Sequence, residues 1–240
     1  MPQHGNRGRQ IISMKYSKNY KKVAELVDSN KVYSIEEACE LVKKTSTVKF
    51  DATVDVSLHL NVDTTKADQQ VRGTLILPNG NGKTKKICAI TSKVEEAKAA
   101  GADFVGGKEL IEKIQKENWF EFDVIVATPD MMGEIGKVAR ILGPKGLMPN
   151  PKTGTVTPNV AQAIKEIKLG KVEYRLDKDA NMHVSIGRVS FTKKALSENL
   201  AALTSTLVKV RPAAVKGTFI KNAVIHTTMG PAIHFTFEGM

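Results

Sequence analysis

Hydrophobic and polar residues alternate along several stretches near the two ends of the chain. Between Val54 and Leu60 every second residue is aliphatic, and polar side chains lie between them. The same alternation returns in three later stretches, 172–177, 182–186 and 233–237. A period of two is typical of strands whose alternate side chains face a core, as in antiparallel sheets with one covered face. A further strand is predicted over about 71–77.

Helical periodicity accompanies these strands in the terminal parts of the chain. Apolar residues at helical spacing predict a helix near 17–28. Ser34 and Glu37 form the capping box of another helix. Towards the C-terminus, a helix carries four leucines on one face: Leu196, Leu200, Leu203 and Leu207. The terminal parts therefore combine one-sided strands with amphipathic helices.

The middle of the chain has a different pattern. Residues 87–90 and 124–127 are continuous apolar runs, as expected for parallel strands that are buried on both faces. Helical segments separate and follow these runs. Ser92 is predicted to cap one helix, and Thr128 is predicted to cap another whose apolar face includes Leu142. Strands that alternate with helices in this way indicate βαβ units.

These two patterns predict a nested, two-domain protein that combines the α+β and α/β classes. Residues 1–80 plus 171–240 are expected to form a discontinuous two-layer α+β domain with a mainly antiparallel sheet. Residues 81–170 are expected to form an inserted, three-layer, Rossmann-like α/β domain. Both crossings between the domains are marked by glycines, and we expect Gly80, Gly82 and Gly170 to act as a hinge.

Residues Arg140–Val156 are predicted to form a long loop of fixed turns. Three prolines in this segment fix φ and remove backbone donors, while three glycines permit positive φ. Loops of this length inside compact domains are uncommon and usually functional. Between Glu134 and Glu166 the chain has basic residues and no acid. Such a loop suits a polyanion, and it also suits a rigid structural cap.

Composition narrows the class of partner. The net charge is +11 and the pI is about 9.5, which favours a nucleic acid or an anionic surface as a partner. No apolar run approaches the roughly 20 residues that span a bilayer, and the first residues do not resemble a signal peptide, so a membrane partner is not expected. Cys39 and Cys88 lack the spacing of metal ligands, and buried apolar roles in a reduced compartment are predicted for them.

An enzymatic function has weak support. Residues Pro78–Thr84 end in Gly-Lys-Thr and therefore invite a nucleotide-binding P-loop hypothesis. However, the first glycine of that motif is replaced by Leu77, and residues 85–90 are predicted to form a strand instead of the required helix. The five histidines are scattered without metal spacing, and those in the strands fall in the polar phase. A P-loop-like nucleotide-binding protein remains the alternative hypothesis.

The C-terminal region is strongly basic. From Asn199 to Phe237 the chain contains lysines and arginine but no acid. Within it, Thr227–Pro231 joins two strands. Threonine hydroxyls can bond phosphate or sugar, Gly230 lets a backbone approach closely, and Met229 offers an apolar surface to a base. The segment also fits an ordinary tight turn, so both interpretations stay open at this point.

Motifs in order along nearly the whole chain resemble the family of the large ribosomal subunit protein "L-one", found in the lateral stalk on the tRNA-exit side. The most characteristic string is Leu142–Lys152. The others are Met1-Pro2-x-His4-Gly5, Lys49-Phe50-Asp51, Asp68-Gln69-x-Val71-Arg72-Gly73, Ala127-Thr128-Pro129-Asp130, Tyr174-Arg175-x-Asp177-Lys178, Lys216-Gly217-Thr218 and Thr227-Thr228-Met229-Gly230. One departure is Asp179-Ala180-Asn181, where a more glycine-containing turn is expected.

The resemblance implies a non-enzymatic structural protein of the cytoplasmic ribosome, a monomer there, with no cofactor and no metal. It implies binding to the stalk segment of large-subunit rRNA and assistance in the release of deacylated tRNA from the exit site. For many bacterial members it also implies repression of translation from their own mRNA. The RNA-binding residues that it implies are Lys49, Phe50, Thr53, Arg175, Asp177, Lys178, Lys216, Thr218, Thr227, Thr228, Met229 and Gly230.

Three points stay open within this hypothesis. Phe50 is expected on the RNA face, with a core position as the alternative. Asp177 would accept from a 2′-OH or a base amine, or hold a neighbouring lysine. The loop Arg140–Val156 is expected in the inserted domain, where a secondary RNA contact and a structural role are both compatible with its sequence.

Overall fold

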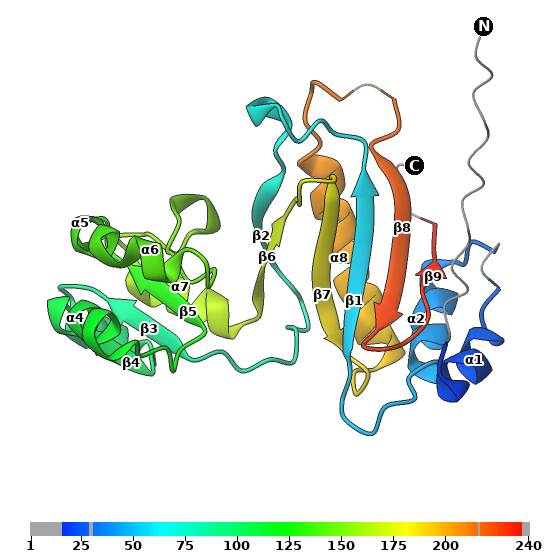
Figure 1. Ribbon diagram of the computed structural model, residues 1–240, viewed down its shortest axis with the longest axis horizontal. Helices are drawn as coiled ribbons and strands as arrows, with labels where there is room; N and C mark the ends of the chain where they lie inside the picture. Colours follow the sequence, from blue (N-terminus) through cyan, green and yellow to red (C-terminus); the bar gives the residue numbers. More distant parts are fainter. Residues whose placement is uncertain (1–15, 29–30, 216, 237–240) are drawn as a thin grey trace, which may run out of the picture.

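A four-stranded antiparallel sheet forms the larger half of the computed structural model, which describes residues 16–28, 31–215 and 217–236 (Figure 1). Its strand order is β7-β1-β8-β9, so the first strand of the chain lies between two of the last. The strands are β1 (Thr53–Leu60), β7 (Asn181–Arg188), β8 (Ile220–Thr227) and β9 (Ile233–His234). All three pairings are antiparallel, and Leu58 lies opposite Met182 on one side and Ala223 on the other.

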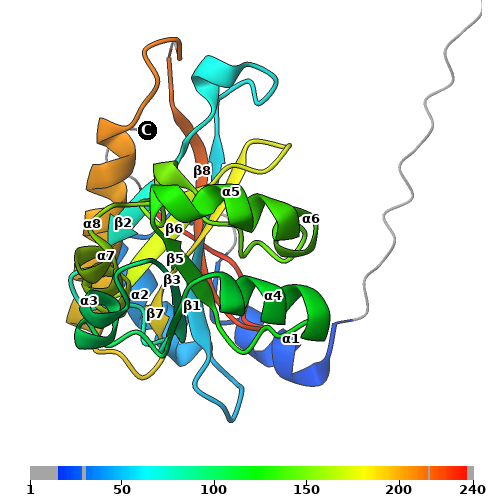
Figure 2. The ribbon, with the colours of Figure 1, turned by 90° about the vertical axis from the view of Figure 1, so that its left-hand side faces the viewer.

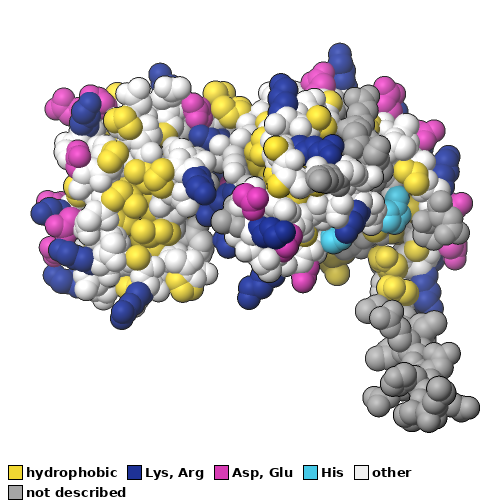
Figure 3. Space-filling view, turned by 90° about the horizontal axis from the view of Figure 1, so that it is seen from above, with side chains coloured by type: hydrophobic (Ala, Val, Ile, Leu, Met, Phe, Trp, Pro, Cys, Tyr) yellow, Lys and Arg dark blue, Asp and Glu magenta, His cyan; other side chains and the backbone are white. Residues whose placement is uncertain are grey.

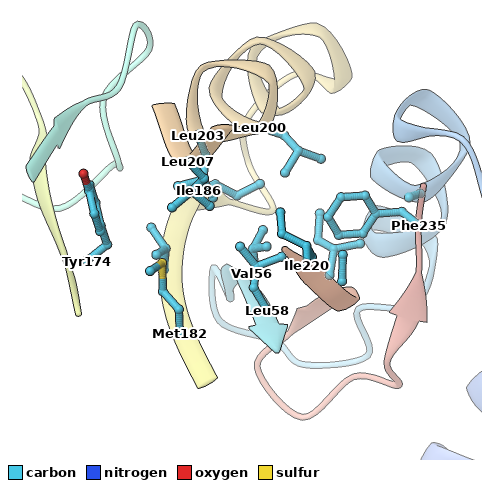
Figure 4. Close-up of a cluster of buried hydrophobic side chains, with 14 of the residues drawn as sticks. Val56, Leu58, Tyr174, Met182, Ile186, Leu200, Leu203, Leu207, Ile220 and Phe235 are labelled. Atoms are coloured by element: carbon cyan, nitrogen blue, oxygen red, sulfur yellow. The ribbon is translucent and has the colours of Figure 1, made fainter. Parts of the chain in front are cut away.

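Two helices cover one face of this sheet. Helices α2 (Ile35–Lys44) and α8 (Lys193–Lys209) both contribute buried side chains to the core beneath it. The four leucines of α8 are fully buried and meet aliphatic side chains of the strands (Figure 4). The capping box at Ser34 is present, as predicted. A short helix, α1 (Lys18–Ala24), packs at the side through Val23.

A two-stranded antiparallel ribbon leads from this half to the rest of the molecule. It pairs β2 (Arg72–Ile76) with β6 (Lys171–Arg175) and follows the short 3-10 helix η1 (Ala67–Gln69). The ribbon meets the four-stranded sheet through a single bridge, between Leu176 and Met182, among the described residues. The predicted strands at 71–77 and 172–177 therefore pair with each other instead of extending the main sheet.

The middle of the chain forms a three-stranded parallel sheet of order β4-β3-β5. Its strands are β3 (Ile87–Ile90), β4 (Phe104–Gly106) and β5 (Val124–Ala127). Helices α4 (Lys108–Glu117), α5 (Met132–Ile135) and α6 (Ala139–Leu142) pack on one face, and α3 (Val94–Ala99) and α7 (Val160–Lys168) on the other (Figure 2). Short 3-10 helices lie between them: η2 (Pro129–Met131), η3 (Gly136–Val138) and η4 (Pro151–Thr153).

The buried clusters follow the same division. One cluster draws on residues from Tyr33 to Leu77 and from Val172 to Phe235. Two others, on opposite faces of the parallel sheet, draw on residues between Ile87 and Ile167. The molecule is therefore a mixed α and β structure. The boundary between its buried apolar clusters lies where the sequence pattern changes.

Several local predictions are wrong in detail. The helix predicted near 17–28 ends at Ala24, and β9 covers two residues instead of five. Helix α3 has Lys93 at its N-cap, so Ser92 does not cap it. Thr128 precedes a 3-10 turn, and its buried hydroxyl has no hydrogen-bond partner. The loop predicted from Arg140 begins only after α6, because the helix continues to Leu142 before the first glycine.

The crossing point is closely packed around glycines. Gly80, Gly82 and Gly170 have φ values of 65°, 70° and 98°, which glycine adopts without strain. A Cβ on Gly170 would lie 2.5 Å from the Cα of Gly80, so the two crossing segments touch through their backbones. The fully buried Asn199 of α8 fixes one of them, because its side-chain amide donates to the carbonyl of Gly80 at 2.9 Å.

Candidate nucleic-acid interface

The face of the four-stranded sheet opposite α2 and α8 is polar. Along β1, buried aliphatic side chains alternate with partly exposed polar ones, as the sequence pattern predicts. At the centre, the Ser57 hydroxyl lies 2.9 Å from Nδ1 of His183 on β7 and 3.1 Å from Nε2 of His226 on β8. Two further pairs, His59 with Asn181 and His234 with Asn222, lie 2.9 and 3.0 Å apart.

The sequence predicted surface positions for histidines in the strands, but it did not predict that they form this row of hydrogen-bonded side chains. Their partners lie on other strands, more than a hundred positions away for His183 and Ser57, so sequence spacing gives no signal for the pairing. The result is a surface of hydrogen-bonded hydroxyl, imidazole and amide groups, and Asp55 of β1 adds a carboxylate to it. Such a surface suits ribose hydroxyls and base edges, which structured RNA presents.

One end of this face gathers seven of the predicted site residues. Lys49 and Phe50 precede β1, Thr53 begins it, and the turn 227–230 after β8 comes back beside them. The Thr228 backbone N–H donates to the Thr53 carbonyl at 3.1 Å. Phe50 is 57% exposed and Met229 is 76% exposed, so two large apolar side chains face solvent here. The alternative that Phe50 is a core aromatic is therefore wrong.

Thr227 and Gly230 differ from the sequence expectation. The Thr227 side chain is 1% exposed, and its hydroxyl lies beneath the surface without a hydrogen-bond partner. A Cβ on Gly230 would lie 2.2 Å from the Thr227 hydroxyl oxygen, so the Thr227 side chain leaves no room for a larger residue at position 230. The positive φ in this turn belongs to Met229, at 65°. The tight-turn and surface interpretations thus both apply to the same four residues.

Three other predicted residues, Asp177, Lys178 and Thr218, lie at the opposite end of β1. Lys178 and Thr218 are exposed, and their backbone carbonyls accept hydrogen bonds from Thr64 and Asn61. Eight residues of strand separate the two ends by roughly 23 Å. Lys216 lies outside the described residues. Apart from Arg175, the structure therefore brings the described members of the predicted site together as two groups, one at each end of the polar face.

Asp177 is engaged in its own turn. Its carboxylate accepts from the backbone N–H groups of Asn181 and Asp179, at 2.7 and 2.9 Å. The bond from Asn181 is the main reason why the pKa of the Asp177 carboxyl lies below its ordinary value. Ala180 takes the positive φ, 61°, that the expected glycine would adopt. This carboxylate is thus a turn-forming group first, and no lysine ion pair holds it among the described residues.

Arg175 belongs to a second, adjoining hollow. A cavity of about 580 Å³ lies between the ribbon and the loop that follows α6. Its walls include Arg72, Arg175, His183, Gly146 and Asn150. Arg72 is paired with Glu173 at 2.7 Å, whereas Arg175 is exposed. The loop therefore borders the edge of the polar face, which its sequence alone does not indicate.

The same loop also has a structural role. The Asn150 carbonyl accepts from the hydroxyls of Thr153 and Thr155, at 3.0 and 3.1 Å. Backbone bonds then join the end of the loop to β5, at Ala127. Met148 packs against the apolar cluster beneath α5 and α6. The structural expectation for Arg140–Val156 is confirmed, and a contact with RNA stays a prediction.

Charged side chains of both signs cover this side of the molecule. Figure 3 shows lysine and arginine side chains mixed with aspartate and glutamate over both halves, and histidines on the half that contains the four-stranded sheet. Residues 16–28, 31–215 and 217–236 contain no group of three metal-ligating side chains and no helix long and apolar enough to span a membrane. The segment after Gly82 continues into β3 without a helix, so the geometry that a P-loop needs is missing there.

Comparison of the sequence with known proteins shows the family of this chain. The sequence profile of the family described as "Ribosomal protein L1p/L10e family" matches residues 42–231. The chain is also 60% identical, over 220 residues, to the "Large ribosomal subunit protein uL1" of Mesoplasma florum. The matched region covers 91% of this chain and 97% of that relative.

Proposed function

Because the chain belongs to the ribosomal protein L1p/L10e family and is a structural constituent of the large ribosomal subunit, we propose that the open face of its four-stranded sheet binds the stalk segment of large-subunit rRNA. As a ribosomal protein of this family it is located in the cytoplasmic ribosome. One observation carries the proposal: the turn 227–230 meets the start of β1 and presents exposed Lys49, Phe50 and Met229 together.

The chemistry of this face supports RNA as the ligand. Lysines at its two ends, Lys49 and Lys178, would meet phosphates, while the hydroxyl and imidazole groups between them would meet ribose and base edges. The roughly 23 Å between the ends allows one helical segment of RNA to touch both groups. Among the residues that the structure describes, this face carries no arginine-bearing helix that would enter a DNA major groove.

The proposal is tested by fluorescence anisotropy with a labelled transcript of the stalk segment. Met229→Asp places a charge against phosphate oxygens and should weaken binding by about tenfold or more. Leu169→Asp is the matched control, because Leu169 is another strongly exposed apolar residue, 65% exposed, and lies at the end of α7. Equal losses in both variants would contradict an interface at the turn.

The division into two domains is part of this proposal. The separate apolar clusters support an RNA-binding unit of residues 1–80 plus 171–240 and an inserted unit of residues 81–170. Replacement of the insertion by a short linker should leave a folded protein that binds the stalk RNA. A well-folded variant without specific binding would count against the placement of the RNA surface.

Two wider roles rest on the same surface and on the crossing point. We propose that the glycine-rich crossing lets the inserted unit move while the stalk assists release of tRNA from the exit site. We also propose that the free protein binds a similar fold in its own mRNA and represses its translation. Competition between the rRNA segment and the leader of that mRNA for one site, measured by anisotropy, tests the second role.

A further inference from the structure

A cleft of about 480 Å³ lies beside the turn after β8, and of its lining residues the predicted RNA surface includes only Met229 and Gly230. One wall is formed by Tyr16 and Tyr20, at the start of α1. The opposite side is formed by Met229 and Gly230 of the turn, and Val48 lies at its edge. The cleft therefore joins the N-terminal helix to one end of the proposed interface.

The tyrosines form an ordered aromatic surface. Their ring centroids are 4.8 Å apart with an interplanar angle of 18°, so the rings are stacked. Tyr16 precedes the N-cap residue of α1 and Tyr20 lies in the first turn of that helix, so the stack joins the residue before the helix to the helix itself. Ser17 caps that helix by accepting from the Tyr20 backbone N–H, and buried Val23 anchors it. The rings are thus positioned by the fold, although Tyr16 is 52% exposed.

Exposed aromatic groups are rare in this protein. Aromatic residues make up 5% of the chain, and most of them are buried or half-buried. Among the described residues, the two aromatic side chains that are strongly exposed are Tyr16 and Phe50. Both lie at the same end of the sheet, since Phe50 follows Val48 closely in the chain. Tyr16 and Met229, both exposed, line the same cleft, and apolar side chains exposed together in this way indicate an interaction site.

Charge selects the kind of partner. Helix α1 carries exposed Lys18, Lys21 and Lys22 and has no acid in its first turn. Lys49 continues this positive charge beside Val48. A polyanion that also presents flat rings is RNA, whose unstacked bases bind to aromatic side chains.

We propose that this cleft binds an unstacked nucleobase of the RNA. The base extends the stack of Tyr16 on Tyr20 and contacts the thioether side chain of Met229, while the lysines of α1 neutralise the flanking phosphates. This inference rests on the proposed RNA-binding function and extends its surface to α1. It makes α1 a part of the binding site that recognises a nucleotide outside a helical stem.

The test measures affinity for the stalk transcript in the full-length protein. Tyr16→Ala should weaken binding roughly five- to a hundredfold, as expected for loss of one base-stacking contact. Tyr16→Phe retains the ring and should bind within about threefold of the unmodified protein. Leu26→Ala is the matched control, because Leu26 is exposed next to α1 but does not line the cleft, and it should bind normally. Melting temperatures verify that all three variants fold.

Ultraviolet crosslinking of the unmodified protein to the same RNA provides the second measurement. Mass spectrometry should identify a nucleotide attached to the peptide that contains Tyr16 and Tyr20. Normal binding by Tyr16→Ala, or failure of Tyr16→Phe to retain affinity, would overturn the stacking proposal. If the unmodified protein does not bind the transcript at all, the RNA-binding function itself fails. Loss of binding in Met229→Asp without any effect at Tyr16 would leave that function standing and reject the cleft alone.

Discussion

The turn 227–230 allows a direct test of why residue 230 is glycine. In Gly230→Ala, the new Cβ would lie 2.2 Å from the Thr227 hydroxyl oxygen, a distance that requires atoms to move. Overpacking of this kind costs about 1–3 kcal/mol of unfolding free energy. The φ of Gly230 is not in the positive range, so the substitution carries no backbone strain of its own.

A second substitution should remove this cost. Thr227→Ala deletes the hydroxyl, which has no hydrogen-bond partner, and loses one buried methyl group at about 0.8 kcal/mol. The Cβ of residue 227 remains 3.5 Å from the new methyl at 230, which is an ordinary contact. In the Thr227→Ala background, Gly230→Ala should therefore be neutral, or stabilising by up to about 1 kcal/mol through the unfolded state.

Urea unfolding of the two single variants and the double variant measures this coupling. We expect a coupling free energy of about 1–3 kcal/mol, and additive costs within about 0.5 kcal/mol would refute the steric explanation. RNA anisotropy on the same proteins then separates the two roles of the turn. The double variant should bind the stalk RNA normally, because the added methyl points towards Thr227. A folded double variant with tenfold weaker binding would mean that the methyl faces RNA.

Three further predictions concern the crossing point, the interface charge and the thiols. Gly170→Ala should lower the free energy of unfolding in urea by roughly 2–6 kcal/mol, since positive φ and a backbone clash each contribute about 1–3 kcal/mol. Gly146→Ala, which also has positive φ but has open space around the new Cβ, should lower it only by the first contribution. Stalk-RNA binding should weaken steeply with salt, and Lys178→Ala should lower the slope of log K against log salt by about 0.7–0.9 if it meets one phosphate; an unchanged slope would remove it from the interface. Burial raises the pKa of Cys39 to about 11 and of Cys88 to about 12, so both thiols should resist Ellman's reagent at pH 8 until the protein unfolds. Because unfolding lowers both pKa values towards 9.0, their contribution to stability should be complete below pH 9 and disappear as pH rises through 11–12, and a protein lacking both cysteines should show a smaller alkaline loss.

The strands and helices followed from sequence where local physics decides them. The alternation along β1 and the capping box at Ser34 depend on neighbours a few residues away, and both are present. Thr128 occupies the predicted N-cap position, but the following segment begins as a 3-10 turn and the buried Thr128 hydroxyl makes no capping hydrogen bond. Whether the Thr128 hydroxyl makes a capping bond depends on tertiary packing, which the local sequence pattern does not predict.

The candidate site was predictable only in part for the same reason. The sequence identified Thr228 and Thr53 separately, but their contact joins residues 175 positions apart. The row of histidine partners and the cleft beside Tyr16 also arise from long-range pairing. Exposure of Phe50 depended on whether the preceding loop covers it, and the sequence left that alternative open. The sequence pattern thus predicted candidate residues, whereas the contacts between them depend on the fold.

The central position of β1 has a consequence for how the chain is made. Its two neighbours in the sheet, β7 and β8, are the seventh and eighth strands in chain order, so β1 leaves the ribosome long before either partner exists. At about 5–20 residues per second, synthesis from Leu60 to Thr227 takes on the order of 10–30 s. The parallel sheet and its helices, which lie between them in the chain, can fold during that interval. The polar face is completed last, so a nascent chain gains its RNA-binding surface only when translation is nearly finished.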